Sequence, residues 1–391
     1  MHTYARFPIT LVRGEGMYVW DESGKRYLDF LGGIAVNGVG HCHPKVVKAI
    51  QDQTAMLMHT SNLYHTQPQE KLADVLAATT GGDFTKMFFC NSGAEANEAA
   101  LKIARKYGKT AGPPSSNSGG GKTKIVSVTG SFHGRTFGTL SATAQPKYQA
   151  PFAPLVPDFC YVQFNDLDAL QDAVDASTCG VILEPIQGES GVHPADPKFL
   201  KYARTLCDTF GALLIFDEIQ CGMGRTGSWW AYQKVGVVPD VLTTAKSLGG
   251  GLPIGACLAR GEAAETLVPG DHGSTFAGNA VTCAAALATI DVIESEGLIR
   301  NATEVGDYLR RKLYHELADY IVEVRGAGLM VGVELKSPIA KAIVTAALPE
   351  GLILNATGET TLRLLPPLIA TREHVDEAVG IMRTVVAELS S

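Results

Sequence analysis

Between about residue 60 and residue 290, short apolar runs bounded by turn residues alternate with segments of helical periodicity. Continuous apolar runs of this length indicate strands that are buried on both faces. Strands of this kind that alternate with helices are typical of a mainly parallel sheet in an α/β protein. The runs are Met87–Cys90, Ile125–Val128, Val181–Leu183, Ala212–Phe216, Val241–Thr244 and Ile254–Ala259.

The sequence predicts a crossover helix directly after the first of these runs. Ala96, Ala100, Ile103 and Tyr107 share one helical face. Gly108 stands where a helix could end, so we expect the helix to stop there. The Pro-, Ser- and Gly-rich residues 111–121 then predict a surface loop.

The pattern changes at both ends of the chain. Near the start, Asp-Glu-Ser-Gly-Lys between two apolar pieces predicts a hairpin over residues 17–30. In the last hundred residues, strand-like runs alternate with helices, and the final helix places Val375 through Leu389 on one stripe. We therefore expect three parts: residues 1–58, an N-terminal segment that joins the small domain; residues 59–290, the large domain; and residues 291–391, a smaller α+β domain.

Charge and cysteine usage exclude several classes of protein. Lys and Arg number 33 against 40 Asp and Glu, a formal net charge of −7, which disfavours a nucleic-acid partner. No stretch has the apolar length of a membrane span, and no signal peptide is legible at the start. The eight cysteines are scattered and never form Cys-x-x-Cys, so we expect reduced thiols, a cytoplasmic location and no metal.

Two glycine-rich segments resemble nucleotide-binding loops. Gly121-Lys122-Thr123 lacks the required earlier glycine and precedes a strand instead of following one, so we reject a phosphate loop. The segment 222–227 does match Gly-x-Gly-x-x-Gly after a strand. The acidic residue expected about 20 positions later is missing, so a nicotinamide-dependent oxidoreductase remains only a remote alternative.

Three other features have complementary chemistry. Asp217 ends a buried strand, at the sheet edge where α/β proteins bind ligands. Lys246 follows another strand and enters a glycine-rich turn, where its amine could act as a nucleophile. The run Asn91–Ala94 leads into the crossover helix and offers free backbone N–H groups for a phosphate. Pyridoxal 5′-phosphate carries the matching ring nitrogen, aldehyde and phosphate.

These residues resemble the signature of the class-III pyridoxal-phosphate aminotransferases, and further runs are similar to the acetylornithine aminotransferase branch. The resemblance spans nearly the whole chain and implies a fold-type I transferase that forms a homodimer with shared active sites. The matching runs include 28–30, 33–36, 40–44, 61–64, 91–98, 131–136, 184–189, 216–220, 224–227 and Lys246. Two departures, Ser190 and Ala280 where the family often has Gly and Pro, change no proposed chemical group.

The resemblance also implies roles around the cofactor. Lys246 would hold the cofactor covalently and move the substrate proton, while Asp217 would pair with the ring nitrogen. The other implied cofactor contacts are Ser92, Gly93 and Ala94 at the phosphate, Phe132 against the ring, Gln220 at the ring oxygen, and Ser274 and Thr275 reaching the phosphate from the neighbouring subunit.

Three charged residues would select the substrates. Arg135 would bind a carboxylate of the ω-amino substrate, and Arg363 the α-carboxylate of glutamate or 2-oxoglutarate, with Glu189 as the switching partner of Arg363. The expected reaction is transfer of the δ-amino group of N2-acetylornithine to 2-oxoglutarate, a step of arginine biosynthesis. Alternatives are another ω-aminotransferase acting on ornithine, succinylornithine or 4-aminobutyrate and, more remotely, a binding protein without enzymatic activity.

Overall fold

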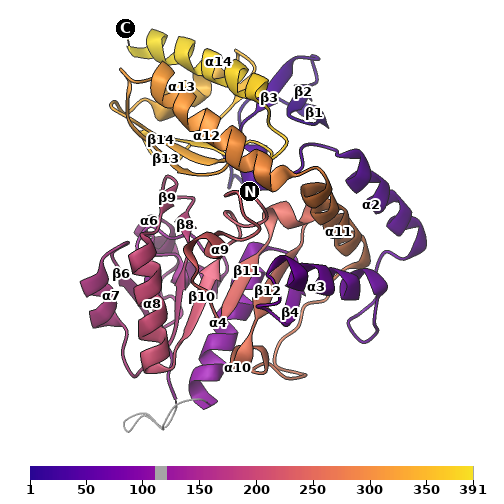
Figure 1. Cartoon of the computed structure of the whole chain (residues 1–391), viewed down its shortest axis with the longest axis vertical. Helices are drawn as coiled ribbons and strands as arrows, with labels where there is room; N and C mark the ends of the chain where they lie inside the picture. Colours follow the sequence, from indigo (N-terminus) through magenta and orange to yellow (C-terminus); the bar gives the residue numbers. More distant parts are fainter. Residues whose placement is uncertain (111–120, 391) are drawn as a thin grey trace.

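The apolar runs of residues 60–290 form one sheet in the computed structural model, which describes residues 1–110 and 121–390 (Figure 1). Its seven strands lie in the order β4-β12-β11-β10-β7-β5-β6. Strands β11, β10, β7, β5 and β6 are parallel, and β12 is antiparallel to both of its neighbours. The expected α/β fold class with a mainly parallel large sheet is confirmed. The bounds are β4 Lys86–Cys90, β5 Lys124–Val128, β6 Phe159–Val162, β7 Thr178–Leu183, β10 Leu213–Asp217, β11 Val241–Thr244 and β12 Gly255–Ala259.

Helices cover both faces of this sheet. Alternate residues of β10 point to opposite sides: Leu213 and Ile215 pack in the cluster formed with α4 (Gly93–Thr110), whereas Leu214 and Phe216 pack in the cluster that includes α8 (Pro197–Phe210). Burial on both faces explains why the strands are apolar throughout. The edge strand β6 was not expected, because it is only partly buried and lacks a continuous apolar signal.

The crossover helix α4 does not end at Gly108, as the sequence analysis expected, but continues to Thr110. Gly108 is needed for a different reason. A Cβ atom there would lie 2.5 Å from both Cys179 Cβ and the Lys122 carbonyl oxygen, so only glycine lets the helix approach the sheet this closely. Lys122, from the rejected phosphate loop, donates to the carbonyls of Phe210 and Gly211 and therefore ties this region together.

A second group of strands lies at the other end of the molecule (Figure 1). Strands β13 (Ile321–Ala327), β14 (Met330–Leu335), β17 (Thr361–Leu364) and β16 (Asn355–Ala356) form an antiparallel sheet. Helices α12 (Leu298–Glu316), α13 (Ala340–Ala347) and α14 (Arg372–Ser390) accompany it. The stripe of α14 is buried as expected except at Leu389, which is 40% exposed at the last turn.

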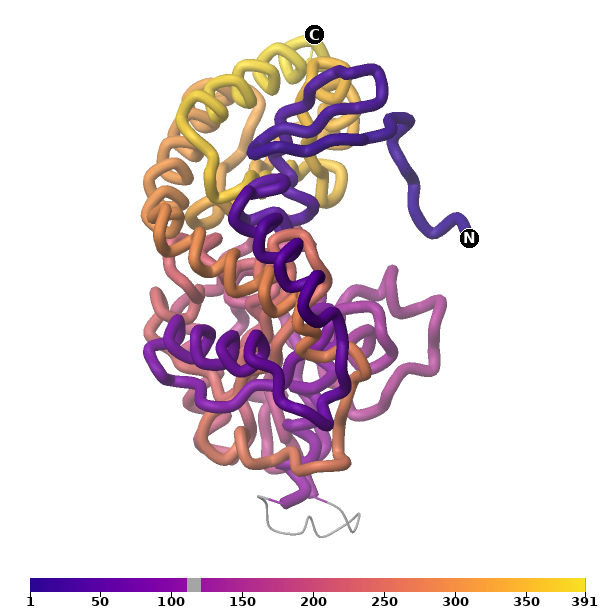
Figure 2. Tube along the Cα trace, turned by 90° about the vertical axis from the view of Figure 1, so that its right-hand side faces the viewer, coloured from indigo at the N-terminus to yellow at the C-terminus, as the bar shows by residue number. Residues whose placement is uncertain are grey.

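The expected hairpin near the start forms from β2 (Tyr18–Asp21) and β3 (Arg26–Asp29). Strand β1 (Leu11–Glu15) extends it on one side, and β15 (Leu352–Ile353) pairs in parallel with β3 on the other. The N-terminal strands thus lie beside the C-terminal residues (Figure 2). The division of the chain at residues 58 and 290 remains a proposal.

The remaining elements are short connections and the helices beside the large sheet. None of the helices in the described ranges is long and apolar enough to cross a membrane. The loop predicted over residues 111–121 falls outside the described residues except for Gly121. The bounds are α1 Gly32–Ala35, α2 Pro44–Met56, α3 Gln67–Thr79, α5 Phe137–Ala142, α6 Pro146–Gln149, η1 Ala150–Phe152, α7 Leu167–Ala173, β8 Ile186–Gln187, β9 His193–Pro194, α9 Ala231–Val235, η2 Lys246–Gly249, α10 Gly261–Ala264 and α11 Ala280–Ser295.

Candidate active site

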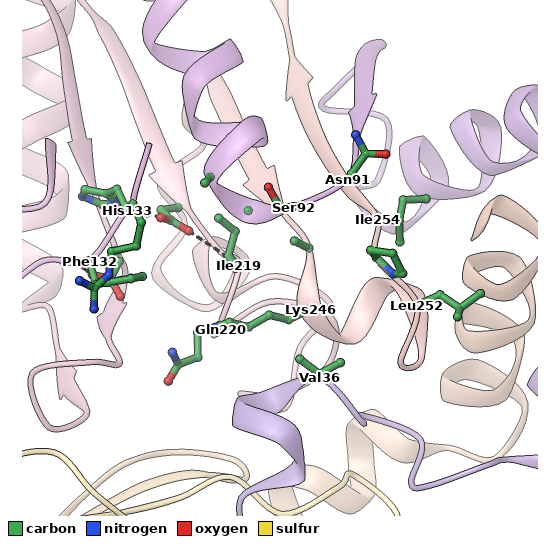
Figure 3. Close-up of a pocket in the computed structure, with 18 of the residues that line it drawn as sticks. Val36, Asn91, Ser92, Phe132, His133, Ile219, Gln220, Lys246, Leu252 and Ile254 are labelled. Carbon is green, nitrogen blue, oxygen red and sulfur yellow. Dashed lines mark hydrogen bonds and ion pairs between the residues drawn. The ribbon is translucent and has the colours of Figure 1, made fainter. Parts of the chain in front are cut away.

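A cavity of about 460 Å³ opens beside the carboxyl ends of β10 and β11 and the first turn of α4 (Figure 3). This is the edge at which α/β sheets bind ligands, and the volume suits a small organic molecule. Most of the residues expected from the sequence line it. They are Ser92, Gly93, Ala94, Phe132, Arg135, Asp217, Gln220 and Lys246.

Lys246 is delivered into the cavity by the turn that follows β11 (Figure 3). Its φ of +46° is a left-handed conformation that is uncommon for a residue with a side chain and often marks a functional position. Burial and, to a smaller extent, the Arg363 guanidinium lower the pKa of Lys246 to about 8, against the opposing charges of Asp217, Glu189 and Glu184. A substantial fraction of this amine is therefore uncharged at mildly alkaline pH, as a nucleophile requires.

Asp217 lies at the carboxyl end of β10 and is almost completely buried. Its Oδ2 atom accepts a hydrogen bond from Asn97 Nδ2 at 2.7 Å and lies 2.8 Å from His133 Nδ1. Its Oδ1 atom accepts from the backbone N–H of Ile219 at 3.0 Å. A buried carboxylate with several donors can remain charged and hold a protonated ring nitrogen.

The first turn of α4 forms another wall of the cavity. Ser92, Gly93 and Ala94 line it where the helix begins, and the first backbone N–H groups of a helix have no partner within the helix. This end of a helix is suited to a phosphate. Ser274 lies close by in the same chain, where its Oγ accepts from Asn91 Nδ2 at 3.0 Å, but Ser274 and Thr275 do not line the cavity.

Phe132 and Arg135 approach from the segment after β5. The guanidinium of Arg135 lies 3.9 Å from the ring centre of Tyr148 and 5.4 Å from that of Phe132. Arg135 is otherwise exposed, so its charge is available to a ligand at the mouth of the cavity. The backbone N–H of Phe132 donates to Glu184 Oε1 at 2.9 Å.

Arg363 reaches the same region from β17 of the second sheet and is 1% exposed. Its Nη1 donates to Glu189 Oε2 at 2.8 Å and approaches Gln220 Oε1 at 3.4 Å, while Nη2 donates to Asn355 Oδ1 at 2.8 Å. The expected pairing of Arg363 with Glu189 is therefore present in the geometry. Neither residue is among those lining the cavity, although Gln220, which touches Arg363, does line it.

Asn97, His133 and Glu184 belong to runs that carry the family resemblance, but the sequence indicated no role for them. Burial raises the pKa of Glu184 to about 7, with the charge of Asp217 acting in the same direction and His133 in the opposite one. Glu184 also accepts from the backbone N–H of Gly188 at 3.1 Å. Helical spacing could have indicated Asn97, which lies one turn after Gly93 and so faces the same side of α4.

The Gly-x-Gly-x-x-Gly segment is not part of this cavity. Its Arg225 is completely buried and donates to the carbonyls of Leu329 and Pro366, which belong to the second group of strands and its connections. Burial lowers the pKa of Arg225 to about 10. The glycine-rich turn thus packs against protein, and the nicotinamide alternative is not favoured. Among the described residues, no group of His, Cys, Asp and Glu is arranged to hold a metal.

The donor set fits pyridoxal phosphate. The cavity combines a lysine with a lowered pKa, a buried carboxylate with remaining acceptor capacity, and a helix N-terminus. These groups match the aldehyde, the ring nitrogen and the phosphate of that molecule. The three groups come from β10, β11 and α4, so the packing of the large sheet alone brings them together.

Comparisons with known proteins agree with this chemistry. The family profile described as "Aminotransferase class-III" matches residues 1–386. The acetylornithine aminotransferase of Methanocaldococcus jannaschii is 51% identical over 100% of this chain and 96% of its own length, and that of Caldanaerobacter subterraneus subsp. tengcongensis is 47% identical over 100% and 97%.

Solved structures give the same result. The N-acetylornithine aminotransferase of Stenotrophomonas maltophilia K279a superposes with a TM-score of 0.86 at 37% identity, covering 100% of this chain and 98% of that one. The ornithine aminotransferase of Toxoplasma gondii ME49 superposes with a TM-score of 0.92 at 34% identity, covering 100% and 93%. With this likeness over its whole length and a cavity suited to pyridoxal phosphate, the chain belongs to the class-III aminotransferase family.

Proposed function

We propose that this enzyme transfers the δ-amino group of N2-acetylornithine to 2-oxoglutarate, giving N-acetylglutamate 5-semialdehyde and glutamate, with pyridoxal 5′-phosphate as cofactor. The proposal is supported by full-length similarity to proteins named acetylornithine aminotransferases. It places the enzyme in arginine biosynthesis in the cytoplasm. The predominantly buried cysteines, all with free thiols, suit a reducing compartment.

The observation that carries the substrate assignment is the ion pair between Arg363 and Glu189 beside the cavity. A transaminase must accept two ligands in turn at one site. With Glu189 in place, the charge of Arg363 is neutralised and the ω-amino substrate binds through Arg135. When Glu189 turns away, Arg363 becomes available to the α-carboxylate of glutamate or 2-oxoglutarate. The Glu189 side chain is 29% exposed and has room to move, whereas Arg363 is fixed by Asn355.

Within the site, Lys246 is the catalytic base. Its Nζ atom would take the proton from the substrate carbon that bears the amino group and deliver it to the cofactor carbon that is bonded to the transferred nitrogen. Pyridoxal phosphate supplies the electrophilic carbon and the ring that accepts the electron pair. Asp217 holds the ring nitrogen proton, and its negative charge keeps that proton in place.

The other residues orient the cofactor. Ser92, Gly93 and Ala94 would bind the phosphate through the hydroxyl and backbone N–H groups, and Phe132 would lie against the ring. Gln220 would donate to the ring oxygen, which is consistent with its contact to Arg363 through its own side-chain oxygen. Ser274 and Thr275 of the partner subunit would complete the phosphate site in a homodimer.

An exposed apolar patch supports the homodimer. Leu63 and Tyr64 are 85% and 69% exposed, and their segment is tied to the one containing Phe276 by a hydrogen bond from Asn62 Nδ2 to the Ala277 carbonyl. Phe276 is itself 59% exposed. Exposed apolar groups in one place are typical of an interface. Leu63→Glu should therefore yield monomers in light scattering, whereas Leu167→Glu, on the outer helix α7, should leave the dimer intact.

The substrate assignment is tested by steady-state turnover with a panel of amino donors. We expect kcat/KM to be highest for N2-acetylornithine, lower for succinylornithine, and lowest for ornithine and 4-aminobutyrate. Higher kcat/KM for ornithine would favour the alternative ω-aminotransferase, a serious competitor because ornithine aminotransferases share the fold. Reduction with borohydride should bleach the visible absorption of the purified enzyme.

A further inference from the structure

The side chain of Asn97 links the cofactor carboxylate to a threonine on the neighbouring strand. Asn97 is 0% exposed on α4, and Thr243 is 0% exposed on β11. Thr243 Oγ1 donates to Asn97 Oδ1 at 2.7 Å, and Asn97 Nδ2 donates to Asp217 Oδ2 at 2.7 Å. Thr243 is also the strand partner of Asp217 in the sheet register. The three residues therefore form a closed bridge between two strands and a helix.

The bridge fixes the orientation of the amide. The second N–H of Asn97 Nδ2 has its own acceptor, the His133 carbonyl, at 2.8 Å. Turning the amide over would place its oxygen against two acceptors, the Asp217 carboxylate and the His133 carbonyl, and its NH₂ group against the Thr243 hydroxyl. The Asp217 carboxylate and the His133 carbonyl therefore fix the amide so that Asn97 presents a donor to Asp217, and the Thr243 hydroxyl holds the other end of the amide by donating to its oxygen.

The bridge also leaves Asp217 with one defined direction for a ligand. A carboxylate has about four acceptor positions, and three of them are occupied by Asn97, His133 and the N–H of Ile219. The remaining capacity lies on Oδ1, and Asp217 lines the cavity. A carboxylate held in this way does not need to reorganise when a ring N–H arrives.

We propose that Asn97 and Thr243 are positioning residues that hold Asp217 in the orientation required to bind the protonated ring nitrogen of the cofactor. The inference rests on the proposed use of pyridoxal phosphate but not on the choice of amino substrate. A purely structural role is the competing explanation, because buried polar groups need partners in any protein. The two explanations differ in whether loss of the Thr243 hydroxyl weakens binding only when the cofactor has a ring nitrogen.

The adjacent residue provides a matched control. Thr244 is equally buried, but its Oγ1 has no hydrogen-bond partner within the described part of the chain, and it does not line the cavity. Thr243→Val and Thr244→Val thus each replace one buried hydroxyl by a methyl group on the same strand. Only the first removes the donor that holds the side-chain oxygen of Asn97. Thr243→Ser retains that donor and should restore binding.

The experiment strips the full-length enzyme of cofactor and titrates it, by visible absorption, with pyridoxal phosphate and with its 1-deaza analogue, in which carbon replaces the ring nitrogen. We expect Thr243→Val to raise the Kd of pyridoxal phosphate about tenfold, the upper range for loss of one hydrogen bond between neutral groups, with Thr243→Ser and Thr244→Val within about twofold of wild type. The Kd of the analogue should be the same in all four proteins.

If Thr243→Val lost the same affinity for pyridoxal phosphate and for its analogue, or lost affinity for neither, the proposal would be overturned and a structural role would remain. If Thr243→Val does not fold, Thr243→Ala removes the same hydroxyl without adding a methyl group, with Thr244→Ala as its control, and the same comparison decides. Failure of wild type to bind pyridoxal phosphate would instead refute the proposed cofactor. An unexpected substrate ranking would leave this inference untouched.

Discussion

The two ends of the proposed active site are built differently. At the proposed cofactor end, Asp217 and Asn97 are buried within the large sheet and its helix, and their side chains have several partners each. At the proposed substrate end, Arg135 is exposed, and within the described part of the chain the one side-chain partner of Glu189 is Arg363, which comes from the other sheet. The cofactor stays throughout the reaction while the substrates alternate, so rigidity is useful at the first end and freedom to rearrange at the second.

Removal of the amine at the cofactor end should have the largest effect. Lys246→Ala should lower kcat for transamination about ten-thousand-fold, because among the described residues that line the cavity no other lysine supplies an amine. Mass spectrometry after borohydride reduction should find a pyridoxyl adduct on Lys246 of wild type and none in the variant. The exposed-face control Lys48→Ala should retain full activity. An adduct on another lysine would contradict the assignment of Lys246.

At the substrate end, Arg363→Lys should discriminate between the two half-reactions. Lysine cannot reproduce the planar guanidinium that contacts Glu189 and Asn355, so we expect KM for 2-oxoglutarate and glutamate to rise about a hundredfold. KM for N2-acetylornithine should change much less, since that ligand uses Arg135. Arg383→Lys on α14 controls for general effects of the replacement. Equal changes in KM for 2-oxoglutarate and for N2-acetylornithine would mean that the two substrates do not use different arginines.

Glu189→Gln should change KM for glutamate less than Arg363→Lys does, and in the opposite direction. Loss of the negative charge leaves Arg363 permanently available, so KM for glutamate should fall about fivefold while KM for N2-acetylornithine rises by a similar factor. Half-reaction kinetics followed by absorption would measure both. If both constants moved in the same direction, Glu189 would not act as the switch.

The remaining effect concerns the stability of the protein without cofactor. In the folded state the pKa of Lys246 is lowered from 10.5 to about 8, so between these values the unfolded chain binds the extra proton and stability rises with pH. Lys246→Met removes this penalty and should stabilise the cofactor-free protein by about 3 kcal/mol at neutral pH. The gain should shrink as pH rises from 8 to 10.5 in urea unfolding. A constant gain would indicate that packing, not charge, is responsible.

The large sheet was predictable because its strands are buried on both faces and are therefore apolar throughout. Strand β6 was missed because it lies at the edge and its burial is incomplete. Gly108 was misread as a helix end because its requirement, the close approach of Cys179 and Lys122, comes from residues distant in sequence. Local patterns report burial and turns, whereas close approaches arise only when the elements pack.

The residues of the proposed site also fall into those that local sequence patterns indicate and those that they do not. Asp217, Lys246 and the start of α4 were predictable because each stands at the end of a recognisable strand or the start of a helix. Asn97 and Thr243 were not, because their importance lies in a contact between residues far apart in the chain. No periodicity reports which buried amide will face which carboxylate. The pairing of Arg363 with Glu189 was expected only from the family resemblance.

The pairing of β3 with β15 has a consequence for how the chain is made. On the ribosome the N-terminal hairpin emerges first, but its neighbouring strand is translated only near the end. That edge of β3 therefore has no strand partner while the large sheet, which lies between β3 and β15 in the sequence, is synthesised and folds. Chaperone binding to nascent chains should accordingly persist until the last strands have left the exit tunnel.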